Sequence, residues 1–367
     1  MNNKNIIYLF GEGRINRLNN NTDSSDEFFY GFKEVKKNYN NTLIVEMNSK
    51  YQKPVLKFID KVLRKLSHLP FYLAHIVTFK NMKKILKADT IIATNDRIAL
   101  SALPVLIIAK IFNKTNILVI VMGMLTNSEK YKNNVLDRLF MSIFLKVINQ
   151  FFFLGKPEAG KAKILFPKYS SKFSFLPFCV NEEFWNDDNK LSAEDKKNIA
   201  FIGNDGNREY EKVVEIANSL PEINFTFVTQ LIKKDDIPEN VNLISGSWNE
   251  NTISDEDIRT IYLNSKLTII PLKDTIQPSG QSVTLQSLSV GTPVMITLTE
   301  GFWDFEKYQN NKNIIFIKDN STESWVSEIK NFYSNKKLLD EISIEGSKLI
   351  KKEYNKGVFE KELMKFI

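Results

Sequence analysis

The chain has 367 residues, which suits two α/β domains better than one core, and its 43% hydrophobic and 12% aromatic content excludes global disorder. A single cysteine, Cys179, excludes a disulfide framework and a cysteine metal cluster, and two histidines, His68 and His75, argue against a multi-histidine metal site. The net charge of +7 calls for an anionic partner, but the basic residues form no dense run. This spread argues against nucleic acid and leaves anionic lipid, nucleotide or glycan phosphate open.

The sequence contains no obvious targeting or membrane-spanning segment. Its start leads directly into a short predicted strand rather than a signal peptide, and no apolar run reaches the roughly eighteen residues of a membrane span. Together with the single cysteine, these features predict a cytoplasmic protein.

The first half of the chain alternates short apolar runs with helical patterns. We predict strands at 5–10, 42–47, 88–94, 116–121 and 151–154, and helices at 26–37, 100–112 and 135–150. Residues 53–87 also carry helical patterning, with Pro54 and Pro70 as boundaries. Gly11 and Gly13 follow the first strand and allow a backbone to approach a ligand, with Arg14 as a source of charge, although ordinary turn chemistry explains them too. Asp96 follows the third strand, where open α/β sheets hold their chemistry; a helix cap is the alternative.

A second alternation follows a polar stretch. We predict strands at 199–202, 223–229, 241–244, 266–271, 293–297 and 313–317, with helices at 208–220, 255–264, 323–333, 336–352 and 356–367. Repeated strand–helix units imply two doubly wound parallel sheets with right-handed crossovers.

Residues 267–296 form the most informative stretch, a buried strand, a polar turn, a helix and another buried strand. Pro278 and Gly280 mark the turn, and the helix that opens behind them points free backbone N–H groups beyond the sheet edge, as at an anion site. Ser282 and Gln286 share one helix face, so a ligand with its phosphate at the helix start would meet Gln286 one turn later. The alternative is a plain crossover whose small-residue helix packs closely on its sheet.

Four segments in order carry a family resemblance. Residues 176–185 read Leu-Pro-Phe-Cys-Val-Asn-Glu-Glu-Phe-Trp, 201–208 contain a glycine turn, 261–271 end in Thr-Ile-Ile-Pro, and 277–294 hold the turn and helix just described, with Gly-Thr-Pro-Val at the end. With them the chain resembles the family 4-like glycosyltransferases of the GT-B fold, which build cell-surface polysaccharides from nucleotide sugars. The resemblance implies two Rossmann-like domains facing across a cleft: an acceptor-side domain at 1–180, a linker at 181–198, a nucleotide-sugar domain at 199–352, and a C-terminal helix at 353–367 that packs back on the first domain.

The predicted transfer reaction also assigns roles to individual residues. Arg208 would be the cation that stabilises the departing diphosphate, and Asp96 would orient the acceptor. No metal and no cofactor beyond the nucleotide-sugar donor are implied. The predicted donor-binding residues are Gly11, Gly13, Arg14, Gly203, Asp205, Arg208, Ser279, Gly280, Gln281, Ser282 and Gln286.

The chain departs from the family at two places. Many relatives carry a histidine after a first-domain strand, where this chain has Met122 or Asp96. The second departure is in the donor motif. Where relatives commonly carry two glutamates, one toward the sugar and one toward the ribose, this chain has Pro278 and Gln286. Gln286 can still bond ribose hydroxyls, whereas Pro278 offers neither a charge nor an N–H. A non-catalytic relative that binds a nucleotide sugar or glycan therefore remains an alternative, as does a nucleotide-sugar epimerase of the same fold.

The resemblance predicts transfer of a sugar, with retention at the anomeric carbon, to a glycan or lipid-linked acceptor. The helices of the first half are apolar and carry many lysines, which suggests peripheral contact with anionic lipid at the inner face of the plasma membrane. Ordinary core helices explain the same pattern equally well.

Overall fold

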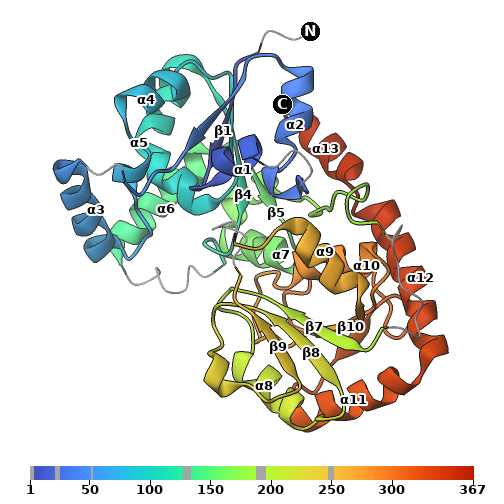
Figure 1. Ribbon diagram of the computed structural model, residues 1–367. Coiled ribbons are helices and arrows are strands. Elements are labelled where there is room, and N and C mark those ends of the chain that lie inside the picture. Colours follow the sequence, from blue (N-terminus) through green and yellow to red (C-terminus); the bar gives the residue numbers. More distant parts are fainter. Residues whose placement is uncertain (1–3, 21–24, 51–52, 127–133, 187–195, 247–251) are drawn as a thin grey trace. The chain divides into compact units, whose positions relative to one another are not determined.

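The structure is a computed structural model that describes residues 4–20, 25–50, 53–126, 134–186, 196–246 and 252–367. The chain forms two compact units (Figure 1), which we describe separately. Unit 1 comprises the described residues of 1–22, 28–177 and 360–367, and unit 2 those of 23–27 and 178–359. The units therefore exchange short segments, because residues 25–27 lie in unit 2 and the C-terminus lies in unit 1.

Unit 1 is built on a six-stranded parallel sheet in the order β2-β1-β3-β4-β5-β6. Its strands are β1 (Ile6–Phe10), β2 (Thr42–Glu46), β3 (Thr90–Ala93), β4 (Asn116–Val121), β5 (Gln150–Phe153) and β6 (Phe173–Phe175). Every residue of β1, β3 and β5 is buried, as expected for parallel strands that are covered on both faces.

The helices of unit 1 are α1 (Arg14–Asn20), α2 (Phe32–Asn38), α3 (Pro54–Ser67), α4 (Phe79–Ile85), α5 (Asp96–Asn113), α6 (Val135–Val147) and α7 (Lys156–Leu165). The most apolar of them, α5, is largely buried and packs beside α4 and α6. The end of the chain joins this unit after α13 (Lys356–Met364), where the Phe366 ring lies 4.9 Å from that of Phe152 and the Phe366 carbonyl accepts a 2.7 Å hydrogen bond from Asn116 Nδ2.

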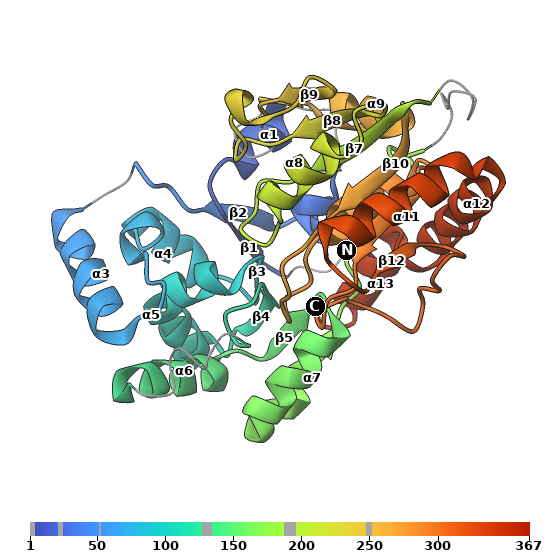
Figure 2. The ribbon, with the colours of Figure 1, turned by 90° about the horizontal axis from the view of Figure 1, so that it is seen from below.

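Unit 2 is a second six-stranded parallel sheet, in the order β12-β11-β10-β7-β8-β9. Its strands are β7 (Asn198–Ile202), β8 (Asn224–Val228), β9 (Val241–Ile244), β10 (Ser265–Ile270), β11 (Val294–Thr297) and β12 (Ile315–Ile317). Its helices are α8 (Tyr210–Asn218), α9 (Asp255–Leu263), α10 (Gln281–Ser289), α11 (Thr322–Ser334) and α12 (Lys336–Glu353). Helix α8 packs beside α11 (Figure 2). Helix α10 contacts α9 and α12.

The strand orders locate the ligand-binding edge of each sheet. In unit 2 the chain runs outward from β7 to β9 and then returns to β10 on the other side of β7, so the direction of winding reverses between β7 and β10. In unit 1 the same reversal lies between β1 and β3. Open α/β sheets bind ligands outside the carboxyl ends of the strands at such a switch point.

The predicted parallel, doubly wound sheets are confirmed, and most strands begin and end within two residues of the prediction. One predicted helix is wrong. The helix at 26–37 is interrupted, because Tyr30 and Gly31 are left-handed with φ of 48° and 73°, and only a 3-10 turn at Glu27–Phe29 precedes α2. The helical stretch at 53–87 breaks near the predicted boundary Pro70: α3 begins at Pro54 and ends at Ser67, His68 is left-handed with φ of 49°, and a 3-10 turn at Leu73–His75 separates α3 from α4.

Other boundaries differ in ways that affect the site residues. Helix α5 begins at Asp96 rather than at residue 100, and α8 begins at Tyr210 rather than at Arg208. Helix α7 and strand β6 were not predicted. The predicted linker at 181–198 is in part packed structure, since Trp185 is fully buried in unit 2; residues 187–195 lie outside the described residues. None of the helices in the described ranges is long and apolar enough to cross a bilayer.

Candidate functional site

The switch point of unit 2 joins two loops, one after β7 and one after β10. Arg208 forms an antiparallel bridge with Leu272, and the Lys273 N–H donates to the Asn207 carbonyl at 2.9 Å. Asn207 Nδ2 in turn donates to the Ser279 hydroxyl at 2.8 Å. These bonds hold the glycine turn at 203–207 against the loop that leads into α10.

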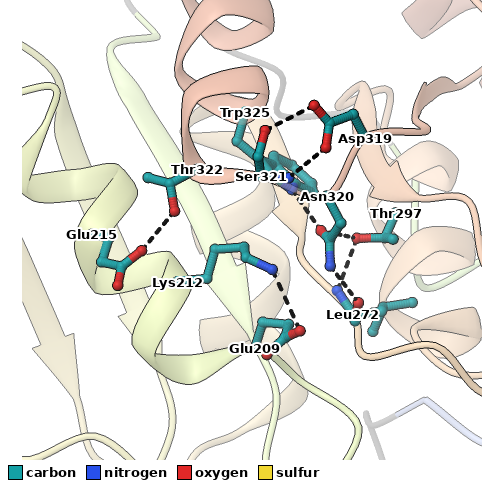
Figure 3. A network of polar contacts seen from close by, with 10 residues as sticks. All are labelled: Glu209, Lys212, Glu215, Leu272, Thr297, Asp319, Asn320, Ser321, Thr322 and Trp325. Atoms are coloured by element: carbon teal, nitrogen blue, oxygen red, sulfur yellow. Dashed lines mark hydrogen bonds and ion pairs between the residues drawn. The ribbon is translucent and has the colours of Figure 1, made fainter.

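A hub of polar contacts fixes the start of that second loop (Figure 3). Asn320 Nδ2 donates to the Leu272 carbonyl at 2.9 Å, and Asn320 Oδ1 accepts from the Thr297 hydroxyl and from Trp325 Nε1, both at 2.9 Å. The Leu272 N–H donates to the same Thr297 hydroxyl at 2.9 Å. The carboxyl ends of β10 and β11 are therefore tied together, so the loop enters α10 from a rigid base.

Helix α10 opens on a glycine that no other residue could replace without strain. Gly280 is the N-cap, with φ of 76°, and a Cβ there would lie 2.9 Å from Ile270 Cγ2 and 3.2 Å from Ile296 Cδ1. Gly280 has no side chain with which to cap the first-turn N–H groups of Gln281, Ser282 and Val283. The positive end of the helix dipole is thus presented at the sheet edge, as the sequence predicted for Gly280.

Arg208 is a buried cation with unused donors. Its side chain is 3% exposed, and its Nη1 lies 3.0 Å from Asp205 Oδ2 in an ion pair. Its Nε and Nη1 make no hydrogen bond to any described residue. Gly203 makes room for the guanidinium, because a Cβ at Gly203 would lie 2.7 Å from Nε. A buried guanidinium with spare N–H groups is costly unless an acceptor fills the site, and an anionic ligand would do so.

Gln286 lies further along α10 in a buried polar cluster. Its Nε2 donates to Glu27 Oε1 at 2.9 Å, and its Oε1 accepts from the Tyr262 hydroxyl at 3.4 Å. Trp185 Nε1 also donates to Glu27 Oε1, at 2.8 Å. Both ends of the Gln286 amide are therefore already engaged within unit 2, so the predicted ribose contact through this amide stays a prediction that would need a shared or exchanged hydrogen bond.

Glu27 was not predicted as a site residue. Burial raises the pKa of its carboxyl to about 7, against the lowering effect of the hydrogen bonds from Gln286 and Trp185. Its second oxygen, Oε2, has no hydrogen-bond partner in the described part of the chain. Glu27 is 259 positions from Gln286, and no local pattern around it signalled the contact.

The predicted residues of unit 1 lie at that unit's own switch point. Gly11 follows β1, and a Cβ there would meet, among the described atoms, only Ile98 Cδ1 at 3.9 Å. Gly13 has φ of 91°, which explains the glycine by turn geometry. Arg14 begins α1, and burial lowers its pKa.

Both carboxylate oxygens of Asp96 accept hydrogen bonds from nearby backbone N–H groups. The residue is 2% exposed; Oδ2 accepts from the N–H groups of Met122 and Met124, both at 3.0 Å, and Oδ1 accepts from the Arg97 N–H at 2.9 Å. The carboxylate thus clamps the turn after β4 to the start of α5. Asn95, whose Oδ1 accepts from the Arg97 N–H at 2.7 Å, is the N-cap of α5, so Asp96 itself is the first helical residue rather than the cap. The acceptor-orienting role of Asp96 stays a prediction.

A second buried carboxyl, Glu158 on α7, lies near Asp96. Burial, followed by the neighbouring charge of Asp96, raises the pKa of Glu158 to about 8. Its Oε1 accepts from the Thr126 hydroxyl at 3.2 Å, whereas Oε2 has no hydrogen-bond partner among the residues described. Because α7 was not predicted, sequence reasoning missed this group.

The structure therefore brings one set of predicted residues together in unit 2. Within the described ranges, no three His, Cys, Asp or Glu side chains converge as a metal-ligand group. The chemistry available at the unit 2 edge is anion binding by a buried guanidinium and a helix N-terminus. The residues of this set are Gly203, Asp205, Arg208, Ser279, Gly280, Gln281 and Ser282.

No protein-family model matches the chain, and no curated protein is significantly similar to it in sequence. Solved structures are similar over almost the whole length. The chain matches Anabaena Alr3699/HepE in complex with UDP-glucose with a TM-score of 0.68 and 10% identity, covering 99% of this chain and 98% of that one. A glycosyltransferase from Rickettsia africae matches with a TM-score of 0.64 and 13% identity, at 100% and 98% coverage.

A putative UDP-N-acetylglucosamine 2-epimerase from Listeria monocytogenes is also similar, with a TM-score of 0.55, 12% identity and coverage of 100% and 96%. At such low identity these likenesses establish the fold alone. The chain has the GT-B fold of two Rossmann-like domains, each carrying a six-stranded parallel sheet, that GT-B glycosyltransferases share.

Proposed function

We propose that this protein is a glycosyltransferase that moves a sugar from a nucleotide-sugar donor to a glycan or lipid-linked acceptor. The observation that carries the proposal is the buried Arg208 guanidinium, with unused donors, at the switch point where α10 begins. A UDP-glucose complex of the structurally similar HepE supports the same class of donor.

In the proposed mechanism, Arg208 and the start of α10 stabilise the leaving group. When the bond between the sugar and the diphosphate breaks, negative charge grows on the leaving diphosphate. A fixed guanidinium and oriented N–H groups at Gly280 and Gln281 stabilise that charge more in the transition state than in the ground state. Because Asp205 and the tie between Asn207 and Ser279 hold these groups in place beforehand, little reorganisation is needed.

Further parts of the proposal rest on the family resemblance. On this proposal the sugar is transferred with retention at the anomeric carbon. The enzyme works in the cytoplasm, and its product becomes part of a cell-surface polysaccharide. The reaction requires no metal ion and no cofactor other than the donor. Gly11, Gly13 and Arg14 would contribute to donor binding from unit 1, and Asp96 would orient the acceptor. Nucleic acid is not an expected partner.

A non-catalytic nucleotide-sugar-binding protein is the second candidate. It is favoured by Pro278 and Gln286, which replace the two motif glutamates, and by the engagement of the Gln286 amide with Glu27 and Tyr262. An epimerase is supported only by a likeness of fold. Release of UDP from a nucleotide sugar would favour the transferase, and tight binding without turnover of any donor would favour the binding protein.

The test begins with a thermal-shift screen of nucleotide sugars to select the base and sugar. Calorimetric titration of the selected donor into Arg208→Ala should then show binding weakened by about 10- to 100-fold, because a buried charge-assisted contact is lost. Lys212→Ala is the matched control, since Lys212 lies nearby on α8 and its Nζ pairs with Glu209 at 3.4 Å. Unchanged donor binding in both Arg208→Ala and Gln286→Ala would refute the proposed site.

A further inference from the structure

Helix α3 packs on unit 1 with its polar side inward. Asp60 is buried, and its two carboxylate oxygens accept from the N–H groups of Leu73 at 2.7 Å and Ala74 at 3.0 Å. Ser67 is also buried and donates to the Leu63 carbonyl at 2.6 Å. Leu63 packs against the core from this same side. The bond from Ser67 lies within α3, so the side of α3 that faces the protein is held by the two bonds of Asp60 and by the packing of Leu63.

The opposite side of α3 exposes a stripe of large apolar residues. Their spacing of i, i+3, i+4, i+7 and i+11 places them in one row along the helix. Val55 is 70% exposed and Phe58 is 67% exposed, values that leave these side chains in water. The full stripe is Val55, Phe58, Ile59, Val62 and Leu66.

Helix α6 extends this stripe. Figures 1 and 2 show α3 at the edge of unit 1 beside α6, and the Asn134 amide donates to the Leu66 carbonyl. The first turns of α6 expose Val135, at 68%, together with Leu136 and Leu139. We call the eight exposed residues of α3 and α6 the apolar face. Exposed apolar clusters of this kind mark an interaction surface rather than a part of the core.

Basic residues flank the apolar face. Lys57, Lys61 and Lys65 on α3 are exposed, as is Arg138 on α6. Asp60 is the only acidic residue between positions 53 and 67, and it is buried. A helix with a narrow apolar stripe, a lysine-rich polar side and low mean hydropathy is typical of helices that lie in the membrane interface.

We propose that the apolar face inserts into the interface of an anionic membrane, with the flanking lysines on the lipid headgroups. The charges favour this occupant over a second copy of the chain. A two-fold contact would bring the same patch together from both copies, so lysines would oppose lysines, and the one acid of α3 is already bound to backbone N–H groups. Negative headgroups supply the missing counter-charge.

This surface distinguishes α3 from the other apolar helix of unit 1. Helix α5 carries a longer apolar run, but most of its apolar residues are buried in the core, and only its last turns expose Ile108, Ile111 and Phe112. The two helices differ in how far their apolar rows are exposed, not in whether they have one. The inference does not depend on the proposed donor site, and each can fail without the other.

The experiment is flotation of the full chain with lipid vesicles at physiological salt. We expect the protein to float with vesicles that contain about 30% phosphatidylglycerol, to float less with pure phosphatidylcholine, and to be released as salt rises. The double variant F58S/V62S should lower the partition coefficient about tenfold or more, because two inserted apolar side chains are lost. K57E/K61E should weaken binding to the anionic vesicles alone.

Ile164→Ser is the matched control, because Ile164 on α7 is 81% exposed in the same unit but lies outside the apolar face. It should float like the wild type, and circular dichroism should show that every variant melts at the wild-type temperature. The proposal is overturned if the wild type does not float with anionic vesicles, or if F58S/V62S floats equally well. A dimer that F58S/V62S dissociates, without any flotation, would assign the face to a second copy and overturn it too.

Discussion

The switch points of the two sheets use their polar residues in opposite ways. In unit 1, both oxygens of Asp96 accept backbone N–H groups of its own loops. In unit 2, Arg208 keeps Nε and Nη1 without hydrogen bonds to the described residues, and Gly280 leaves the start of α10 without a side-chain cap. Similar strand windings thus produce one edge whose buried carboxylate accepts three hydrogen bonds, and one whose buried guanidinium pairs with Asp205 but keeps donor atoms without hydrogen bonds to the described residues. The comparison shows that a strand-end position alone does not identify a binding residue, because its remaining hydrogen-bonding capacity decides.

The largest expected effect is a loss of stability at the switch point of unit 1, where Asp96 is bonded to the backbone. Asp96→Ala should reduce the free energy of unfolding by about 3 to 5 kcal/mol, because the N–H groups of Met122 and Met124 lose their acceptor, whereas the Arg97 N–H still donates to Asn95 Oδ1. Urea unfolding followed by circular dichroism measures the loss. Asp89→Ala is the control, since Asp89 is exposed and accepts one N–H, from Asn5 at 2.7 Å; it should cost less than about 1 kcal/mol. A stable Asp96→Ala protein that has lost only transfer activity would restore Asp96 as a catalytic residue and break the comparison.

The next effect concerns pH. Glu27 has a pKa of about 7 in the folded protein against a reference value of 4.5, so between these values the native state keeps a proton that the unfolded chain has lost. Stability from this group therefore falls as pH rises through that window, by on the order of 3 kcal/mol at most. In Glu27→Gln the loss is absent, so the stability difference between variant and wild type should grow from about pH 5 to pH 7 and then level off.

Urea unfolding of both proteins across this pH range checks the prediction. Glu158→Gln extends the test to unit 1, where the corresponding window should reach about pH 8. If the free energies of unfolding of wild type and variant change in parallel with pH, the carboxyl in that unit titrates normally. The folded protein then does not keep it protonated.

The smallest effect compares the glycines that follow the first strand of each unit. A Cβ at Gly203 meets Arg208 Nε at 2.7 Å, whereas a Cβ at Gly11 meets, of the atoms described, only Ile98 Cδ1 at 3.9 Å. Gly203→Ala should displace the guanidinium and weaken donor binding about tenfold, and Gly11→Ala should leave it within about threefold. Calorimetry with the selected donor measures both. An equal loss in Gly11→Ala would mean that unit 1 shares in donor binding, as the sequence predicted for Gly11.

Much of the fold was predictable because buried parallel strands are continuous apolar runs. The predicted bounds of β4 and β9 agree with the structure to the residue. Helix starts were predictable where a cap is local, as at Ser254, which forms a capping box with Asp257 before α9. The predicted helix at 26–37 failed because Tyr30 takes a left-handed conformation that its residue type does not signal.

By itself the sequence determined the two parallel sheets, the glycine at the start of α10 and the position of Arg208 after β7, since each depends on residues close together in the chain. Tertiary structure alone decided which polar groups remain unsatisfied. Asp96 finds its acceptor role through Met122 and Met124, and Glu27 reaches Gln286 across 259 positions. It also decided which apolar helix is core and which is surface, because α3 and α5 both carry apolar rows and only packing determines what covers them.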